Sequence, residues 1–114
     1  MPEERDYILR LISRIAAMVR RLRERLRGSV DAPEIIREAR AAQGELLGPR
    51  AALLAALDPG SAAALLNDPR ALSLWIDLLR IEAETYRRLG DAAGAASLES
   101  RAEALERQTP DARA

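Results

Sequence analysis

The fold of this chain is decided by the stretch ILRLISRIAAMVRRLRERL at residues 8–26. Its apolar residues recur after four and then three positions, which places them on one face of an α-helix as a heptad seam. Acidic residues before the seam and Gly28 after it predict a helix over residues 1–27. The seam consists of Ile8, Ile12, Ile15, Val19, Leu22 and Leu26.

The arginines of this helix give it a positive net charge, although the net charge of the whole chain is zero. The chain has 18 basic and 18 acidic residues, all the basic ones Arg, and a formal net charge of zero. Residues 1–27 hold eight Arg and four acids, a net charge of +4, so the remainder carries −4. Four arginines line one border of the seam: Arg10, Arg14, Arg21 and Arg25. The helix can therefore pack into its own acidic body, pair with a second copy, or lie on an anionic membrane surface.

The rest of the chain is also helical in its composition, with 23 Ala and 18 Leu and no segment that alternates with period two. Helix breakers and capping residues divide it, and Asp31, Ser61, Asp68 and Asp91 are the expected N-caps. The predicted helices cover residues 32–46, 49–57, 61–66, 68–89 and 91–107, followed by a frayed tail at 108–114. The sequence thus predicts an all-α, single-domain bundle of about five helices over residues 1–107.

Missing residue types exclude most catalytic chemistry. Without His, Cys or Lys there is no imidazole base, thiolate nucleophile, Schiff base or phosphate-loop lysine. Three carboxylates share a helical stripe: Glu99, Glu103 and Glu106. They do not predict a metal site, because carboxylate-bridged metal bundles also use His. We expect no enzymatic activity, metal or cofactor, and an enzyme would need a polar pocket of convergent carboxylates.

The sequence also lacks the features typical of proteins that bind nucleic acid or span a membrane. The chain is neutral, and no aromatic platform lies among the arginines of the first helix, where the one nearby aromatic residue, Tyr7, lies at the helix start. We therefore expect neither nucleic acid nor a small-molecule substrate as partner. No apolar run approaches the roughly 18 residues of a membrane span, and no signal-peptide pattern is present. The expected location is the cytoplasm.

The last third of the chain resembles a known repeat. Residues 76–109 are similar to a single tetratricopeptide repeat, within a repeat-like hairpin over residues 68–107, on the basis of Leu79, Ala83, Tyr86, Gly90, Asp91, Ala95, Ala102 and Leu105. The resemblance implies an antiparallel helical hairpin that turns at Gly90 and Asp91. Glu99 departs from the aromatic residue usual in the second helix, and the closing proline falls late, at Pro110.

The resemblance also implies a peptide-binding face made of Asp77, Arg80, Glu84, Arg87 and Arg88. The alternative is a solvated face on which Asp77 pairs with Arg80 and Glu84 with Arg88 along the helix. Trp75, the only Trp, lies at core spacing and is expected to pack inside. The opening residues 6–12 are also similar to the start of small bacterial helical proteins to which no activity is attached.

These patterns favour a non-catalytic protein-interaction or scaffold protein that self-associates, or binds another protein, through residues 1–27. The alternative is a peripheral membrane protein anchored by the same basic helix.

Overall fold

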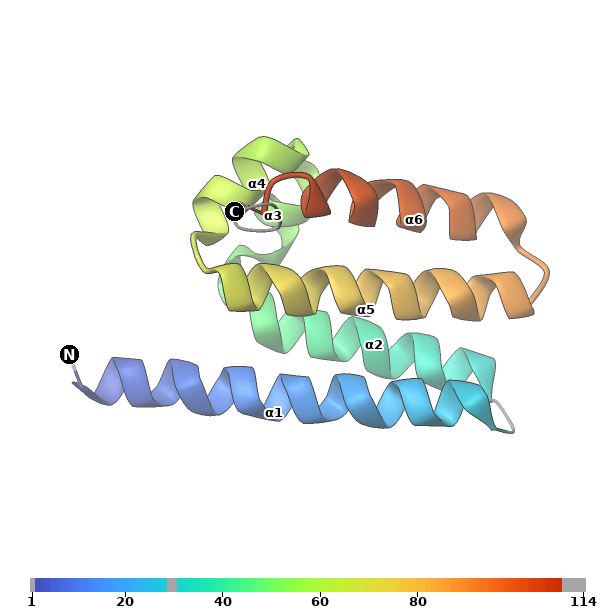
Figure 1. Cartoon of the computed structure of the whole chain (residues 1–114), viewed down its shortest axis with the longest axis horizontal. Coiled ribbons are helices and arrows are strands. Elements are labelled where there is room, and N and C mark those ends of the chain that lie inside the picture. The colour runs from blue at the N-terminus through green and yellow to red at the C-terminus, as the bar shows by residue number, and fades with distance from the viewer. Residues whose placement is uncertain (1, 29–30, 110–114) are drawn as a thin grey trace.

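The computed structural model describes residues 2–28 and 31–109, and these residues form six α-helices, one 3-10 turn and no strand. The elements are α1 (Pro2–Arg27), α2 (Ala32–Leu47), the 3-10 turn η1 (Gly48–Arg50), α3 (Ala51–Ala56), α4 (Pro59–Leu66), α5 (Pro69–Arg88) and α6 (Ala92–Glu106). The prediction of an all-α single-domain bundle is confirmed (Figure 1).

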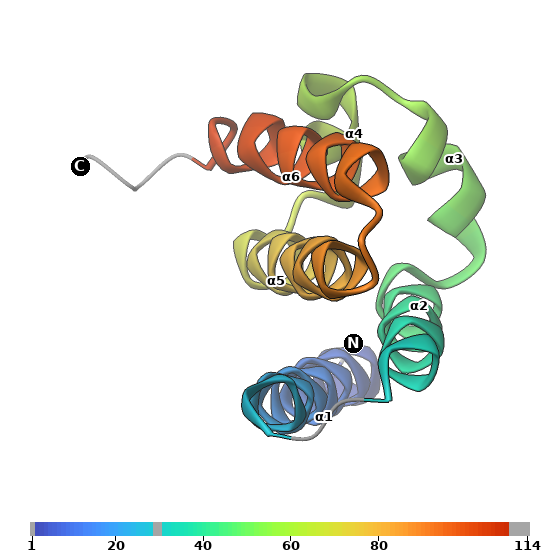
Figure 2. The same cartoon turned by 90° about the vertical axis from the view of Figure 1, so that its right-hand side faces the viewer.

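Helix α5 is the centre of the bundle. It packs against α6, α2 and α1, and an end-on view shows it between α1 and α6 (Figure 2). Helices α5 and α6 form an antiparallel hairpin whose turn contains Gly90 at φ +87°, a conformation that favours glycine. The short helices α3 and α4 cross from the end of α2 to the start of α5 beside α6.

Aspartates begin four of the helices, because a carboxylate can accept the free N–H groups of a first helical turn. Asp31, Asp58, Asp68 and Asp91 cap α2, α4, α5 and α6. The prediction of Ser61 as the cap of α4 is wrong, since Asp58 accepts from the Ser61 backbone N–H at 3.0 Å and the helix starts at Pro59. Hydrogen bonds from the Ser61 side chain and backbone hold the pKa of the Asp58 carboxyl below its ordinary value.

The boundary of another predicted helix also differs. The helix expected over residues 49–57 is shorter, because Gly48 turns the chain at φ +66° and Pro49 follows in the 3-10 turn, so that α3 begins only at Ala51. Beyond α6, in the segment expected to fray, the backbone N–H groups of Gln108 and Thr109 donate to carbonyls of the last turn of the helix. Residues 110–114, which include Pro110, lie outside the described residues.

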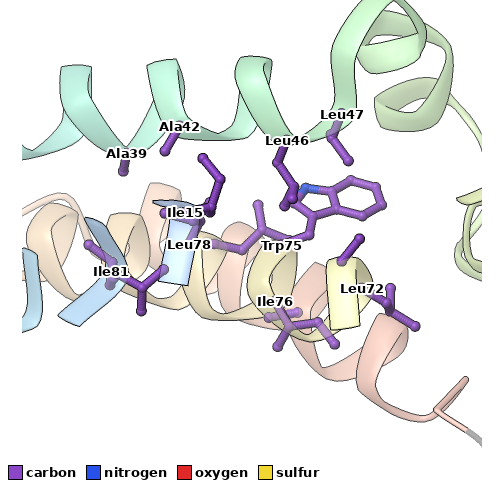
Figure 3. Close-up of a cluster of buried hydrophobic side chains, with 14 of the residues drawn as sticks. Ile15, Ala39, Ala42, Leu46, Leu47, Leu72, Trp75, Ile76, Leu78 and Ile81 are labelled. Atoms are coloured by element: carbon purple, nitrogen blue, oxygen red, sulfur yellow. The ribbon is translucent and has the colours of Figure 1, made fainter. Parts of the chain in front are cut away.

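The core lies where α1, α2 and α5 meet. Ile15 of α1, Ile35 of α2 and Leu78 of α5 are each 0% exposed. Trp75 is also buried, as predicted, in a cluster with Leu46 that Figure 3 shows between α2 and α5.

Arg101 of α6 holds the short helix α3 in place. Its guanidinium donates to the carbonyl oxygens of Leu54 (2.9 Å) and Leu57 (2.8 Å) and lies 5.6 Å from the centre of the Trp75 ring. These carbonyls lie at the C-terminal end of α3. The last carbonyl groups of a helix receive no hydrogen bond from a helical N–H group and need a donor from elsewhere. One side chain therefore joins α3, α5 and α6.

We expect Arg101→Met to lower the free energy of unfolding by about 2 kcal/mol, because it removes two charge-assisted hydrogen bonds from partly buried carbonyls. Urea unfolding followed by circular dichroism measures the change. Arg107→Met is the matched control, since the Arg107 side chain is exposed and bonds to no described residue. Equal effects of the two substitutions would contradict the role assigned to Arg101.

Candidate interaction surface

Helix α1 is longer than the helix it pairs with. It has 26 residues and runs antiparallel to α2, which has 16. The ion pairs Arg25–Glu38 and Arg14–Glu45, both 2.8 Å, fix the alignment of the two helices. In this alignment α2 ends opposite the third turn of α1, so about 15 Å of α1 extends past the end of α2 at 1.5 Å per residue (Figure 1).

The seam is therefore divided into a buried part and an exposed part. Four of its members are buried, with exposed fractions of 0–7%: Ile15, Val19, Leu22 and Leu26. Ile12 is half-buried, and Ile8 is 43% exposed. Intramolecular packing thus accounts for the last four members of the seam and not for Ile8.

The exposed end of α1 carries three large apolar residues in succession. Tyr7, Ile8 and Leu9 are 58%, 43% and 43% exposed. We call residues 4–10 the α1 tip; its other members are two acids and two arginines, all exposed. Other exposed leucines, such as Leu89 at the α5–α6 turn, are single large apolar residues on their elements. The α1 tip is therefore the most concentrated exposed apolar surface among the described residues.

A groove lies between the α1 tip and the start of α5. Its volume is about 550 Å³, and it is open to solvent. Helix α1 lines it with Glu4, Arg5, Ile8 and Leu9, and α5 with Asp68 and Arg70. Each wall thus carries one acid and one arginine. The Asp68 carboxylate is held in place because it accepts from the Arg70 backbone N–H at 2.9 Å.

Basic residues in the second half of α1 dock onto acids of the body. Arg14 and Arg25 bind carboxylates of α2, and the hydrogen bond to Glu38 is the main cause that raises the pKa of Arg25 above its ordinary value. Arg23 pairs with Asp77 of α5 at 2.9 Å. The other two predicted border arginines, Arg10 and Arg21, form no ion pair with any residue that the structure describes.

Two residues of the expected peptide-binding face contact helix α1. Asp77 contacts Arg23 of α1, and Arg88 donates to the carbonyl oxygen of Leu26, also on α1. The expected Asp77–Arg80 pair is wrong, because each of these side chains finds a partner on another helix. Spacing along α5 therefore did not decide which residue pairs with Asp77.

Two further residues of that face, Arg80 and Arg87, are tied to α6, Arg87 through Glu99 at 3.7 Å. Arg80 pairs with Glu99 (3.2 Å) and Glu106 (2.9 Å), and its hydrogen bond to Glu106 is the main cause that raises its pKa above the ordinary value. The expected Glu84–Arg88 pair is confirmed at 3.4 Å, and Arg87 also binds Glu84. Within the described residues, no group of three or more carboxylates is arranged to hold a metal ion.

A buried charged side chain was missed in the sequence. Glu82 of α5 is 4% exposed and accepts from Arg40 Nε of α2 at 3.2 Å and from the Gln43 amide. Arg40 also donates to the hydroxyl of Tyr86. The signal was available, since Glu82 lies seven residues after Trp75 on the core-facing stripe of α5. This network joins α2 to α5.

None of the helices in the described part of the chain combines the length and apolar character needed to cross a membrane. No protein-family model matches the chain, and comparisons with curated proteins and with solved structures find no match. Its function must therefore be inferred from its own geometry.

Proposed function

We propose that this chain is a non-catalytic protein-interaction or scaffold protein whose contact surface is the α1 tip and the adjoining groove. The observation that carries the proposal is the exposure of Tyr7, Ile8 and Leu9 at the end of a helix whose remaining turns are anchored in the core. A contact surface on an anchored helix is already ordered, which reduces the entropy lost on binding.

The position of the charges supports a protein partner over an anionic membrane. A membrane-surface helix surrounds its exposed apolar face with basic residues. Here the strongly basic half of α1 has its apolar face buried, and Arg14, Arg23 and Arg25 are paired with acids. The exposed apolar residues lie at the other end, where two acids balance two arginines. Such a mixed rim is typical of protein interfaces.

We also propose that residues 76–109 form a hairpin of the tetratricopeptide-repeat type, which is the scaffold that carries the α1 tip. The antiparallel pairing of α5 and α6 supports it. Because the charged face of α5 is tied to α1 and α6, we assign that hairpin a supporting role. The α1 tip is left as the surface that meets a partner.

A photo-crosslinking amino acid in place of Ile8 tests the proposal in cells that produce the protein. We expect protein adducts from this position and none from the same amino acid in place of Leu89, the 52% exposed C-cap of α5. The α5–α6 turn lies at the opposite end of the molecule from the start of α1 (Figure 1). A lipid adduct at position 8 would favour the membrane alternative. Failure to obtain any protein adduct there would contradict the proposed function.

A further inference from the structure

We infer that the groove beside the α1 tip receives the α1 tip of a second copy of this chain, so that two copies clasp each other. This inference rests on the proposed function and names the partner of the same surface. The argument depends on the shape of the groove and on the charges of its two walls.

The groove is suited to a reciprocal contact because the α1 tip is itself one of its walls. A second tip placed in the groove lies between the first tip and the start of α5. A two-fold axis then places the first tip in the groove of the second copy, so both contacts are the same. Such an isologous contact closes after two copies and does not continue as a filament.

The charges of the groove complement those of an entering tip. The tip brings Glu4 and Arg5, and the α5 wall holds Asp68 and Arg70, which pair with each other at 3.7 Å. In the dimer Glu4 binds Arg70 and Arg5 binds Asp68, so this longer pair is exchanged for two pairs between copies. Two-fold symmetry repeats these pairs. A surface of one sign would repel its own copy, whereas the α1 tip carries two acids and two arginines. The zero formal charge of the chain also removes long-range repulsion between copies.

Apolar burial supplies the attraction. Ile8 and Leu9 line the groove, and each copy would cover these side chains of the other. The surface is small, with seven tip residues and a short segment of α5 in each copy, which places the contact in the class below about 1,200 Å². We therefore expect a reversible dimer that forms at high concentration.

Sedimentation equilibrium on the purified full chain at low ionic strength tests the dimer. The mass should rise from that of one chain, 12.5 kDa, towards twice that mass. We expect the rise between about 10 µM and about 1 mM, the range of weak contacts. Ile8→Asp should abolish the rise, and Leu89→Asp, the matched control at the other end, should leave it unchanged.

Two charge reversals test the proposed pairs. Glu4→Arg and Arg70→Glu should each weaken association by about tenfold, since each places like charges across both contacts. An equimolar mixture of the two variants should associate as the original chain does. In the mixture one contact has the original charges and the other has both charges reversed. Circular dichroism verifies that each variant is folded.

The inference is overturned if the unchanged chain keeps the mass of one copy at the highest concentration, or if the mixture associates no better than its components. A monomeric chain that still gives adducts with other proteins from position 8 would overturn the second copy as partner and leave the proposed function intact. A monomeric chain without protein adducts would overturn both.

Discussion

Ile15→Asp is expected to lower the free energy of unfolding by more than about 4 kcal/mol, whereas Ile8→Asp is expected to change it by less than about 0.5 kcal/mol. The two residues lie two turns apart on the same seam of α1. Ile15 is 0% exposed and reaches the cluster between α2 and α5, where a carboxylate would have no partner (Figure 3). Ile8 is 43% exposed beyond the end of α2, so a carboxylate there stays hydrated.

Urea unfolding followed by circular dichroism measures both changes, and the fluorescence of Trp75 reports on the core separately. Single domains have unfolding free energies of about 5–15 kcal/mol, so Ile15→Asp should leave the chain unfolded or nearly so at 25 °C. Similar losses at the two positions would show that the tip is packed. A harmless Ile15→Asp would show that the seam is not part of the core.

The division of the seam into a buried part and an exposed part shows which features of α1 could be predicted from the sequence and which could not. The heptad period correctly predicted a helix that ends at Arg27 with Ile15, Val19, Leu22 and Leu26 on one face, because period and face are linked by helix geometry. It left open whether that face packs in the core, pairs with a second copy or lies on a membrane. It could not show where burial stops, since that depends on the partner helix. Helix lengths carry this information, because α2 with 16 residues is ten residues shorter than α1 with 26, and an antiparallel partner ten residues shorter leaves about ten residues uncovered.

Ion pairs were harder to predict than the helices. Arginine is long, and several acids lie within its reach once helices pack, so tertiary partners compete with those three or four residues away. Asp77 therefore binds Arg23 of α1, although the spacing favoured Arg80. The groove was also beyond prediction, because it depends on how far the start of α5 lies from the α1 tip, a distance that no periodicity encodes.

Replacing both donors of the buried Glu82 is expected to cost more stability than replacing the whole network. Arg40→Met with Gln43→Leu should lower the free energy of unfolding by about 3 kcal/mol, because the carboxylate keeps its charge and loses the two side chains that bind it. Adding Glu82→Met should restore the free energy to within about 1 kcal/mol of the original, since no buried charge is then left unpaired. Arg40→Met alone should cost about 1 kcal/mol, because Arg40 is largely exposed and Gln43 still donates.

Urea unfolding of the single, double and triple variants measures their free energies of unfolding. The comparison separates the cost of leaving the Glu82 charge unpaired from the cost of lost side-chain packing. Arg37→Met on the same helix is the control; Arg37 is exposed and pairs with Glu34 only at 3.9 Å, so its loss should cost less than about 0.5 kcal/mol. A triple variant less stable than the double variant would mean that the side chain of Glu82 packs better than methionine. A triple variant more stable than the original chain would mean that the network specifies how α2 docks on α5 at a cost in stability, because an apolar contact could hold the same helices together.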